Sequence, residues 1–144
     1  MLYAERQTFP RSTHIELPGA TAGNDWERAF LWIKQNTPVA ARFAMNPRYI
    51  TEPGEDAQSF RAIAERSALP DYSKDGGEAA ITPPLAYEWM KSVASQADLD
   101  DVTDAERLAI LKPLGVDWVV LRQDARTGFA CGYSGVAVKV CRLP

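Results

Sequence analysis

The segment from Asn24 to Pro47 constrains the fold most, because it combines a capped amphipathic helix, a proline turn and a short strand. Asn24 and Glu27 fit a capping box, in which the asparagine side chain caps the first turn and the glutamate reaches back. Apolar side chains recur at helical spacing at Trp26, Ala29, Phe30 and Ile33, with Trp32 on the flank of this stripe. A helix that leads directly into a strand is typical of a layered α/β domain.

The end of this helix is marked by Pro38. Thr37 precedes the proline and is therefore disfavoured in the α region, so the helix is expected to end there. The following residues 42–45 are predicted to form a short buried strand, which Asn46-Pro47 terminates.

The middle of the chain contains a second helix and a polar stretch. Apolar residues at helical spacing predict a helix over 56–65, and residues 67–70 fit a brief second strand. Residues 71–77, DYSKDGG, have strong turn chemistry and are predicted to be a polar loop.

Two further helices have clear start signals. Thr82 precedes two prolines, a pattern typical of a helix N-terminus, and the predicted buried stripe is Leu85, Trp89, Val93 and Ala97. Thr103 and Glu106 form a second capping box, which opens a helix that Gly115 would end.

Two strands complete the predicted domain. The apolar run 116–121 indicates a central strand covered on both faces, whereas residues 136–140 alternate as in a half-exposed edge strand. We therefore expect one layered α/β domain over residues 24–144, with a mixed sheet of three to five strands and about four helices. Residues 1–23 lack periodicity and are predicted to be an arm or linker.

Composition excludes several classes of function. A net charge of -3 and a pI near 5.2 argue against nucleic-acid binding. The one histidine, His14, excludes zinc sites that need two histidines. Residues 71–77 lack the alternating ligands of a calcium loop, and Gly76-Gly77 lacks the spacing of a phosphate-binding fingerprint. No run approaches the roughly 18 apolar residues of a membrane-spanning helix. We expect no cofactor, no metal and no catalytic residue in this chain.

Polar residues gather after the first two predicted strands, where open α/β sheets bind ligands. The candidate ligand-binding residues are Tyr49, Arg61, Asp71 and Lys74. They could form a site for a polar head group, such as a sugar or phosphate, with positive charge supplied by the lysine and the arginine. Alternatively, they pair with carboxylates across solvated loops, at Glu52, Glu55, Asp56 and Glu65.

Tryptophans and cysteines also leave alternatives. The four tryptophans could form a carbohydrate-stacking surface or belong to the core, and their apolar surroundings favour the core.

Cys131 and Cys141 could be disulfide-bonded or free. A two-residue turn at Ser134-Gly135 would place Cys141 opposite position 128, so a bond requires a wider loop or a bulge.

Several short motifs occur in a fixed order: Trp32-Ile33, Asn36-Thr37-Pro38, Phe60-Arg61, Ala64-Glu65-Arg66-Ser67, and Asp71, Lys74 and Asp75. In this order they resemble the soluble C-terminal domains that follow the transmembrane helices of bacterial membrane glycosyltransferases, which use polyprenyl-phosphate sugars. The likeness covers roughly residues 24–122.

The resemblance implies a non-catalytic accessory domain on the periplasmic side of the inner membrane. Its partner would be the transmembrane part of the same polypeptide, with a glycan or lipid head group as a further ligand, and residues 1–23 would lead in from the last membrane helix. The chemistry would belong to membrane segments, so no catalytic residue carries over. A periplasmic setting would also favour the disulfide. The alternative is a free-standing soluble α/β domain that binds a small molecule.

Overall fold

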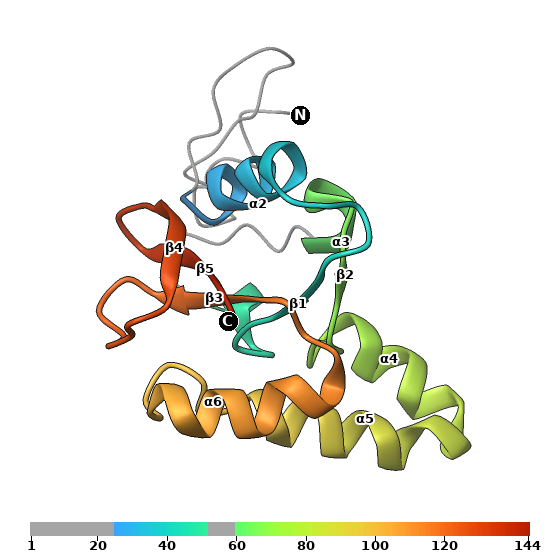
Figure 1. Ribbon diagram of the computed structural model, residues 1–144. Coiled ribbons are helices and arrows are strands. Elements are labelled where there is room, and N and C mark those ends of the chain that lie inside the picture. Colours follow the sequence, from blue (N-terminus) through green and yellow to red (C-terminus); the bar gives the residue numbers. More distant parts are fainter. Residues whose placement is uncertain (1–24, 52–59) are drawn as a thin grey trace, which may run out of the picture.

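A computed structural model describes residues 25–51 and 60–144, in which five α-helices pack on a mixed five-stranded sheet (Figure 1). The helices are α2 (Asp25–Asn36), α3 (Phe60–Ala64), α4 (Lys74–Ile81), α5 (Pro83–Gln96) and α6 (Asp104–Leu111), with 3₁₀ turns η1 (Tyr49–Thr51) and η2 (Lys112–Leu114). The strands are β1 (Arg42–Ala44), β2 (Ser67–Ala68), β3 (Trp118–Arg122), β4 (Ala130–Ser134) and β5 (Val138–Arg142). The predicted layered α/β class is confirmed.

The sheet has the strand order β2-β1-β3-β5-β4, with β1 parallel to β2 and β3, and β5 antiparallel to β3 and β4. The prediction of a central strand near residues 116–121 is confirmed by β3. The prediction of an edge strand at 136–140 is wrong, because β5 is enclosed between β3 and β4. Its side chains at Val138, Val140 and Cys141 are buried, and β4 forms the edge.

Helices cover both faces of the sheet, with α2 and α3 on one side and α6 and the α4–α5 hairpin on the other (Figure 1). Successive residues of β3 point to opposite faces, so Val120 joins the core under α2 while Val119 and Leu121 join the core under α6. The first core is rich in aromatic side chains, including Phe30, Phe43 and Phe60.

Helix α2 agrees with the sequence pattern. Trp26, Ala29, Phe30 and Ile33 are buried, and the helix ends at Asn36, just before Thr37, whose hydroxyl donates to the Ile33 carbonyl at 2.7 Å. Asn24 of the predicted capping box lies outside the described residues, as do the predicted linker 1–23 and residues 56–59 of the second predicted helix.

The segment predicted as a polar loop at 71–77 is instead the start of a helix, so that prediction is wrong from Lys74 onward. The Asp71 carboxylate accepts hydrogen bonds from the Lys74 and Asp75 backbone N–H groups, at 2.6 and 3.4 Å. These bonds satisfy donors that a helix N-terminus leaves unpaired. They offset the poor helix propensity of the two glycines that follow.

The predicted buried stripe of α5 is also wrong. Leu85 is half exposed and Ala97 is exposed, while Trp89 and Val93 are partly buried. The buried residue of α5 is Gln96, whose amide donates to the Pro70 carbonyl at 2.9 Å. Helix α5 therefore contacts the rest of the domain through Gln96 at its C-terminal end and through Trp89 in its middle, whose Nε1–H donates to the Asp71 carbonyl at 3.0 Å.

Cys131 and Cys141 are joined by a disulfide between β4 and β5. Such a bond was expected to require a wider loop or a bulge, and both are present. Residues 135–137 make the connection longer than a two-residue turn, and a bulge at Gly132 shifts the register so that Cys131 faces Cys141. The glycine also lies under the Trp32 ring, where an added Cβ atom would be 2.6 Å from Cη2.

Candidate functional site

Three of the four candidate ligand-binding residues converge. Tyr49, Arg61 and Asp71 line a small cavity near the ends of β1 and β2, with a volume of about 10 Å³. That volume corresponds to about one water molecule. Lys74 does not line the cavity, and its side chain is exposed at the start of α4.

The converging residues already have structural partners. Tyr49 is buried beside Trp26 and Phe30, and its hydroxyl accepts a hydrogen bond from the Phe60 N–H at 2.8 Å. Arg61 forms an ion pair with Asp75 at 2.9 Å and donates to the Ala68 carbonyl at 3.2 Å. The cavity between these side chains has room for about one water molecule, and head-group binding at these residues stays a prediction.

The ion-pair alternative is not met at Glu65, the one of its four carboxylates that lies within the described residues. Glu65 pairs with Lys34 at 2.5 Å rather than with an arginine, and Arg61 pairs with Asp75. The buried Arg66 binds the carbonyl oxygens of Lys34 and Thr37, both at 2.7 Å. The other three carboxylates of that alternative lie outside the described residues.

A much larger groove, which the sequence did not indicate, lies between the α4–α5 hairpin and the η2 end of the domain. Its volume is about 730 Å³, within the usual range of small-molecule sites. Its lining comes from α4 (Asp75, Glu78, Ala79), α5 (Leu85, Glu88, Trp89, Ser92), the strand ends (Arg42, Leu69, Pro70) and η2 (Pro113, Leu114).

Trp89 is held firmly in this groove. Its Nε1–H donates to the Asp71 carbonyl at 3.0 Å, and its ring lies 5.7 Å from the Tyr72 ring between centroids. Tyr72 in turn lies under the Arg48 guanidinium, 3.8 Å from the ring centroid to Cζ. The indole therefore presents a fixed apolar surface.

Charge is unevenly distributed over the groove. In the part of the chain that the structure describes, the Glu78 and Glu88 carboxylates are exposed and have no hydrogen-bond or ion-pair partner. Arg42, on another wall, donates from Nη1 to the Leu114 carbonyl at 3.1 Å. Among the described residues, the lining offers apolar surface and charged side chains to a ligand.

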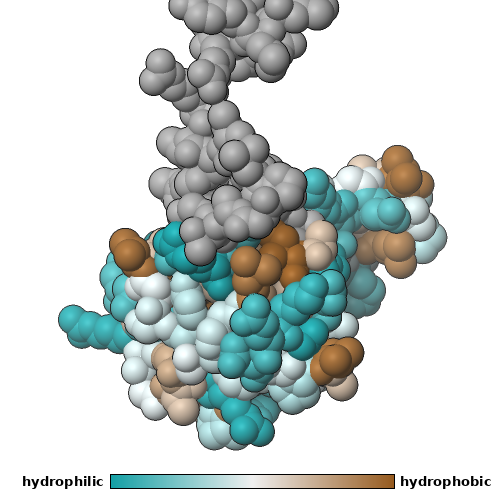
Figure 2. Space-filling view, turned by 90° about the horizontal axis from the view of Figure 1, so that it is seen from above, coloured by the Kyte–Doolittle hydropathy of each residue, from teal (hydrophilic) through white to brown (hydrophobic). Residues whose placement is uncertain are grey.

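The hairpin next to the groove exposes large apolar side chains: Ile81 (80%), Leu85 (50%), Tyr87 (69%) and Met90 (59%). Figure 2 shows apolar side chains at the protruding end of the molecule, on the side where Figure 1 draws the turn between α4 and α5. Scattered single apolar residues are normal on a surface, but a group on one protruding element indicates a contact surface.

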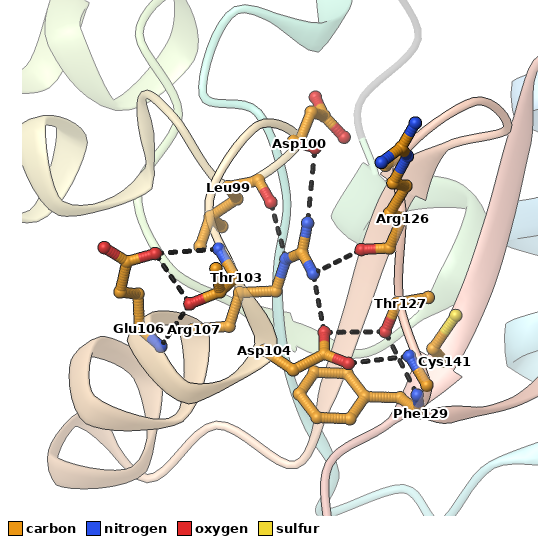
Figure 3. A network of polar contacts seen from close by, with 12 residues as sticks. Leu99, Asp100, Thr103, Asp104, Glu106, Arg107, Arg126, Thr127, Phe129 and Cys141 are labelled. Atoms are coloured by element: carbon orange, nitrogen blue, oxygen red, sulfur yellow. Dashed lines mark hydrogen bonds and ion pairs between the residues drawn. The ribbon is translucent and has the colours of Figure 1, made fainter.

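A buried polar network also stands out, but it belongs to the fold (Figure 3). The fully buried Arg107 side chain donates to the carbonyls of Leu99, Asp100 and Arg126 and to the Asp104 carboxylate, at 2.6–3.2 Å. These bonds join the start of α6 to the loops on either side of it.

The pKa values of two carboxyl groups near this network, those of Asp104 and Asp100, are shifted in opposite directions. Burial acts to raise the pKa of Asp104, but hydrogen bonds from Gly128 N–H, Thr127 and Arg107 outweigh it and hold the pKa below its ordinary value. At Asp100, burial dominates and raises the pKa. The arginine thus satisfies groups that the fold removes from water, and none of its donors faces the groove.

Comparison of the sequence with protein-family models and with curated proteins gives no match. Within residues 25–51 and 60–144, no cluster of three or more histidine, cysteine, aspartate or glutamate side chains could hold a metal ion. No helix in those ranges is long and apolar enough to cross a membrane. The groove and the exposed hairpin are therefore the features on which a functional proposal can rest.

Proposed function

We propose that this chain is a non-catalytic accessory domain of a membrane glycosyltransferase-like protein on the periplasmic side of the inner membrane. In this proposal the α4–α5 hairpin docks on the transmembrane part of the same polypeptide. The motif order from Trp32 to Asp75 supports the membrane neighbour, and the exposed apolar side chains of the hairpin support the docking face.

The exposure of α5 is the observation that carries the proposal. Although α5 extends over 14 residues, Gln96 is its buried residue, whereas α2 buries a full apolar stripe against the sheet. Removing Ile81, Tyr87 and Met90 from water would be favourable, by about 25 cal/mol for each Å² of apolar surface. Tyr87 also suits an interface, because its ring is apolar and its hydroxyl stays hydrated.

The non-catalytic role is supported by the use of the candidate polar residues. Tyr49, Arg61 and Asp71 hold backbone groups or partner side chains, and these contacts leave little freedom for proton transfer. We therefore expect the isolated chain to show no turnover on nucleotide sugars, polyprenyl-phosphate sugars or simple esters. Turnover that survives repurification and disappears when Asp71 or Lys74 is substituted would contradict the proposal.

The membrane neighbour can be tested from the coding sequence. An open reading frame that continues upstream of Met1 and encodes about ten hydrophobic spans supports the proposal. A ribosome-binding site and start codon directly at Met1 would refute it.

The docking face can be tested by photo-crosslinking in the complete polypeptide in native membranes. A photoreactive amino acid at position 87 should crosslink to the transmembrane part. The matched control is position 35, because Gln35 is exposed on α2, on the other side of the sheet. Equal crosslinking from both positions, or crosslinking from position 35 alone, would contradict docking through the hairpin.

A second candidate function is a free-standing domain that binds a small molecule. The groove of about 730 Å³ favours it, since this volume suits a small ligand. The two candidates differ in what covers Tyr87 and Met90, which do not line the groove. A free-standing domain leaves them exposed in the cell, whereas docking buries them.

A further inference from the structure

The groove between α4, α5 and η2 is shaped by regular helix faces. Its lining residues on α5 are Leu85, Glu88, Trp89 and Ser92, a spacing that places them on one face of the helix. On α4 the spacing of Asp75, Glu78 and Ala79 has the same effect. The two helices therefore present carboxylates and apolar side chains to the same space.

The apolar part of this space is preorganised. Trp89 is fixed by its hydrogen bond to the Asp71 carbonyl and by close contact with Gly76, and Leu85 lies one turn before it on α5. A flat or aliphatic ligand body can pack on such a surface without ordering the protein first, which limits the entropic cost of binding.

The hairpin side of this space carries two exposed carboxylates without a protein partner in the described ranges. Asp75 is neutralised by Arg61, whereas Glu78 and Glu88 have no partner among the described residues. Lys74 and Lys91 stand within one helical turn of these glutamates, yet neither forms an ion pair with them. Two carboxylates that line one groove with an indole ring favour a cation, because both negative charge and an aromatic ring attract it.

Arg42 is the opposing charge in the groove. It lies on the wall formed by β1 and η2, where its guanidinium is held by the Leu114 carbonyl. It would repel a cation that approached that wall, and so it restricts a cationic group to the hairpin side. Arg42 would also attract an anionic ligand. A groove that prefers anions can therefore be distinguished from one that prefers cations by comparing ligands of opposite charge.

From this arrangement we propose that the groove binds a small organic ammonium compound with an apolar body. The ammonium group lies near Glu78 and Glu88, and the apolar body packs on Trp89 and Leu85. The site shares Leu85 with the exposed hairpin, but Tyr87 and Met90 of the docking surface do not line it. Its failure would therefore leave the docking role standing.

The test uses three probes that share a phenyl ring on a short chain: 2-phenylethylammonium, 2-phenylethanol and 3-phenylpropionate. Each is titrated into the full ¹⁵N-labelled chain, and the indole N–H signal of Trp89 is followed after assignment by Trp89→Phe. The ammonium should shift this signal saturably and bind about fivefold more tightly than the alcohol, the effect of one exposed ion pair. The propionate should bind more weakly than the alcohol. Equal affinities, tighter propionate binding or no shift would overturn the proposal.

Variants then test the residues. The double change Glu78→Gln and Glu88→Gln should weaken ammonium binding about fivefold and leave alcohol binding unchanged. Asp98→Asn removes a surface charge just beyond α5, outside the groove, and should change neither affinity. Arg42→Gln should strengthen ammonium binding. Unchanged ammonium affinity in the double variant contradicts the proposal, and the ligand series on the unmodified chain tests it even if a variant fails to fold.

Discussion

The indole ring of Trp89 lies against Gly76, so that a Cβ atom added to the glycine would be 2.9 Å from Trp89 Cζ2. Atoms at that separation overlap, and the ring cannot move away freely because Nε1 is bonded to the Asp71 carbonyl. The absence of a side chain at Gly76 thus allows α4 and α5 to pack together and fixes one wall of the groove.

This contact predicts opposite effects for two neighbouring glycines. Gly76→Ala should lower the free energy of unfolding by about 1–2 kcal/mol, because overlap with Trp89 outweighs the gain in helix propensity. Gly77→Ala should raise it by up to about 1 kcal/mol, since its Cβ would meet nothing within 4 Å. Urea unfolding followed by tryptophan fluorescence measures both. Equal stabilisation by the two changes would contradict the described packing.

The aromatic core under α2 gives a second prediction. Phe30 is fully buried and its ring contacts Trp26, Tyr49 and Phe60. Phe30→Ala should therefore cost about 3–5 kcal/mol of stability. Tyr87→Ala on the exposed hairpin should change stability by less than about 0.5 kcal/mol. A thermal melt unchanged by Phe30→Ala would show that α2 presents a different face to the sheet.

The buried Arg107 side chain gives a third prediction. Arg107→Met removes the donors that satisfy Asp104 and three backbone carbonyls, so we expect a loss of about 3–5 kcal/mol. Arg126→Gln is the matched control, because the network uses the Arg126 carbonyl and not its exposed side chain. Denaturant midpoints that fall equally in the two variants would contradict the network in Figure 3.

Asp25 predicts a dependence of stability on pH. Burial acts to raise its pKa, but hydrogen bonds from the Ala137 and Val138 N–H groups and from Arg28 outweigh it, so the pKa lies below its ordinary value of 3.8. A carboxyl whose folded-state pKa is lowered stabilises the protein above the unfolded pKa and loses this effect as the pH falls through the folded value. Asp25→Asn should therefore destabilise the protein at neutral pH and have a smaller effect in acid. An equal effect at pH 7 and pH 3 would count against this role.

The two cysteines predict a chemical result. Protein exported to the periplasm should contain no alkylatable thiol by mass spectrometry, and reduction should lower stability by roughly 2–3 kcal/mol, as expected for a short closed loop. Two alkylatable thiols in exported protein would contradict the bond between Cys131 and Cys141.

Elements with a local sequence signal agree with their predictions. The capping box of Thr103 and Glu106 is present as predicted, and the apolar stripe of α2 is buried as predicted. The predictions are wrong where a partner that is distant in sequence determines the structure. Residues 136–140 alternate like an edge strand, yet β4 covers β5, and the sequence of β4 has no apolar alternation to reveal it.

The candidate site shows the same division. The sequence predicted that Tyr49, Arg61 and Asp71 lie at one end of the sheet, and they do. Their burial and their backbone partners depend on tertiary contacts, such as the hydrogen bond from the Phe60 N–H to the Tyr49 hydroxyl. The groove was not predicted from the sequence, because the low helix propensity of Gly76 and Gly77 led to residues 71–77 being predicted as a loop rather than as the start of α4. Glu78 lines the same groove as Trp89 because it lies on α4, so the groove could not be predicted without that helix.

The central claim, that the α4–α5 hairpin is a docking surface, is tested most directly by amide hydrogen exchange. Exchange over residues 83–96 is compared between the isolated chain and the complete polypeptide in its membrane, with residues 104–111 of α6 as internal reference. Docking predicts markedly slower exchange of α5 in the complete polypeptide and unchanged exchange of α6. Equal protection of α5 in both samples would contradict the claim.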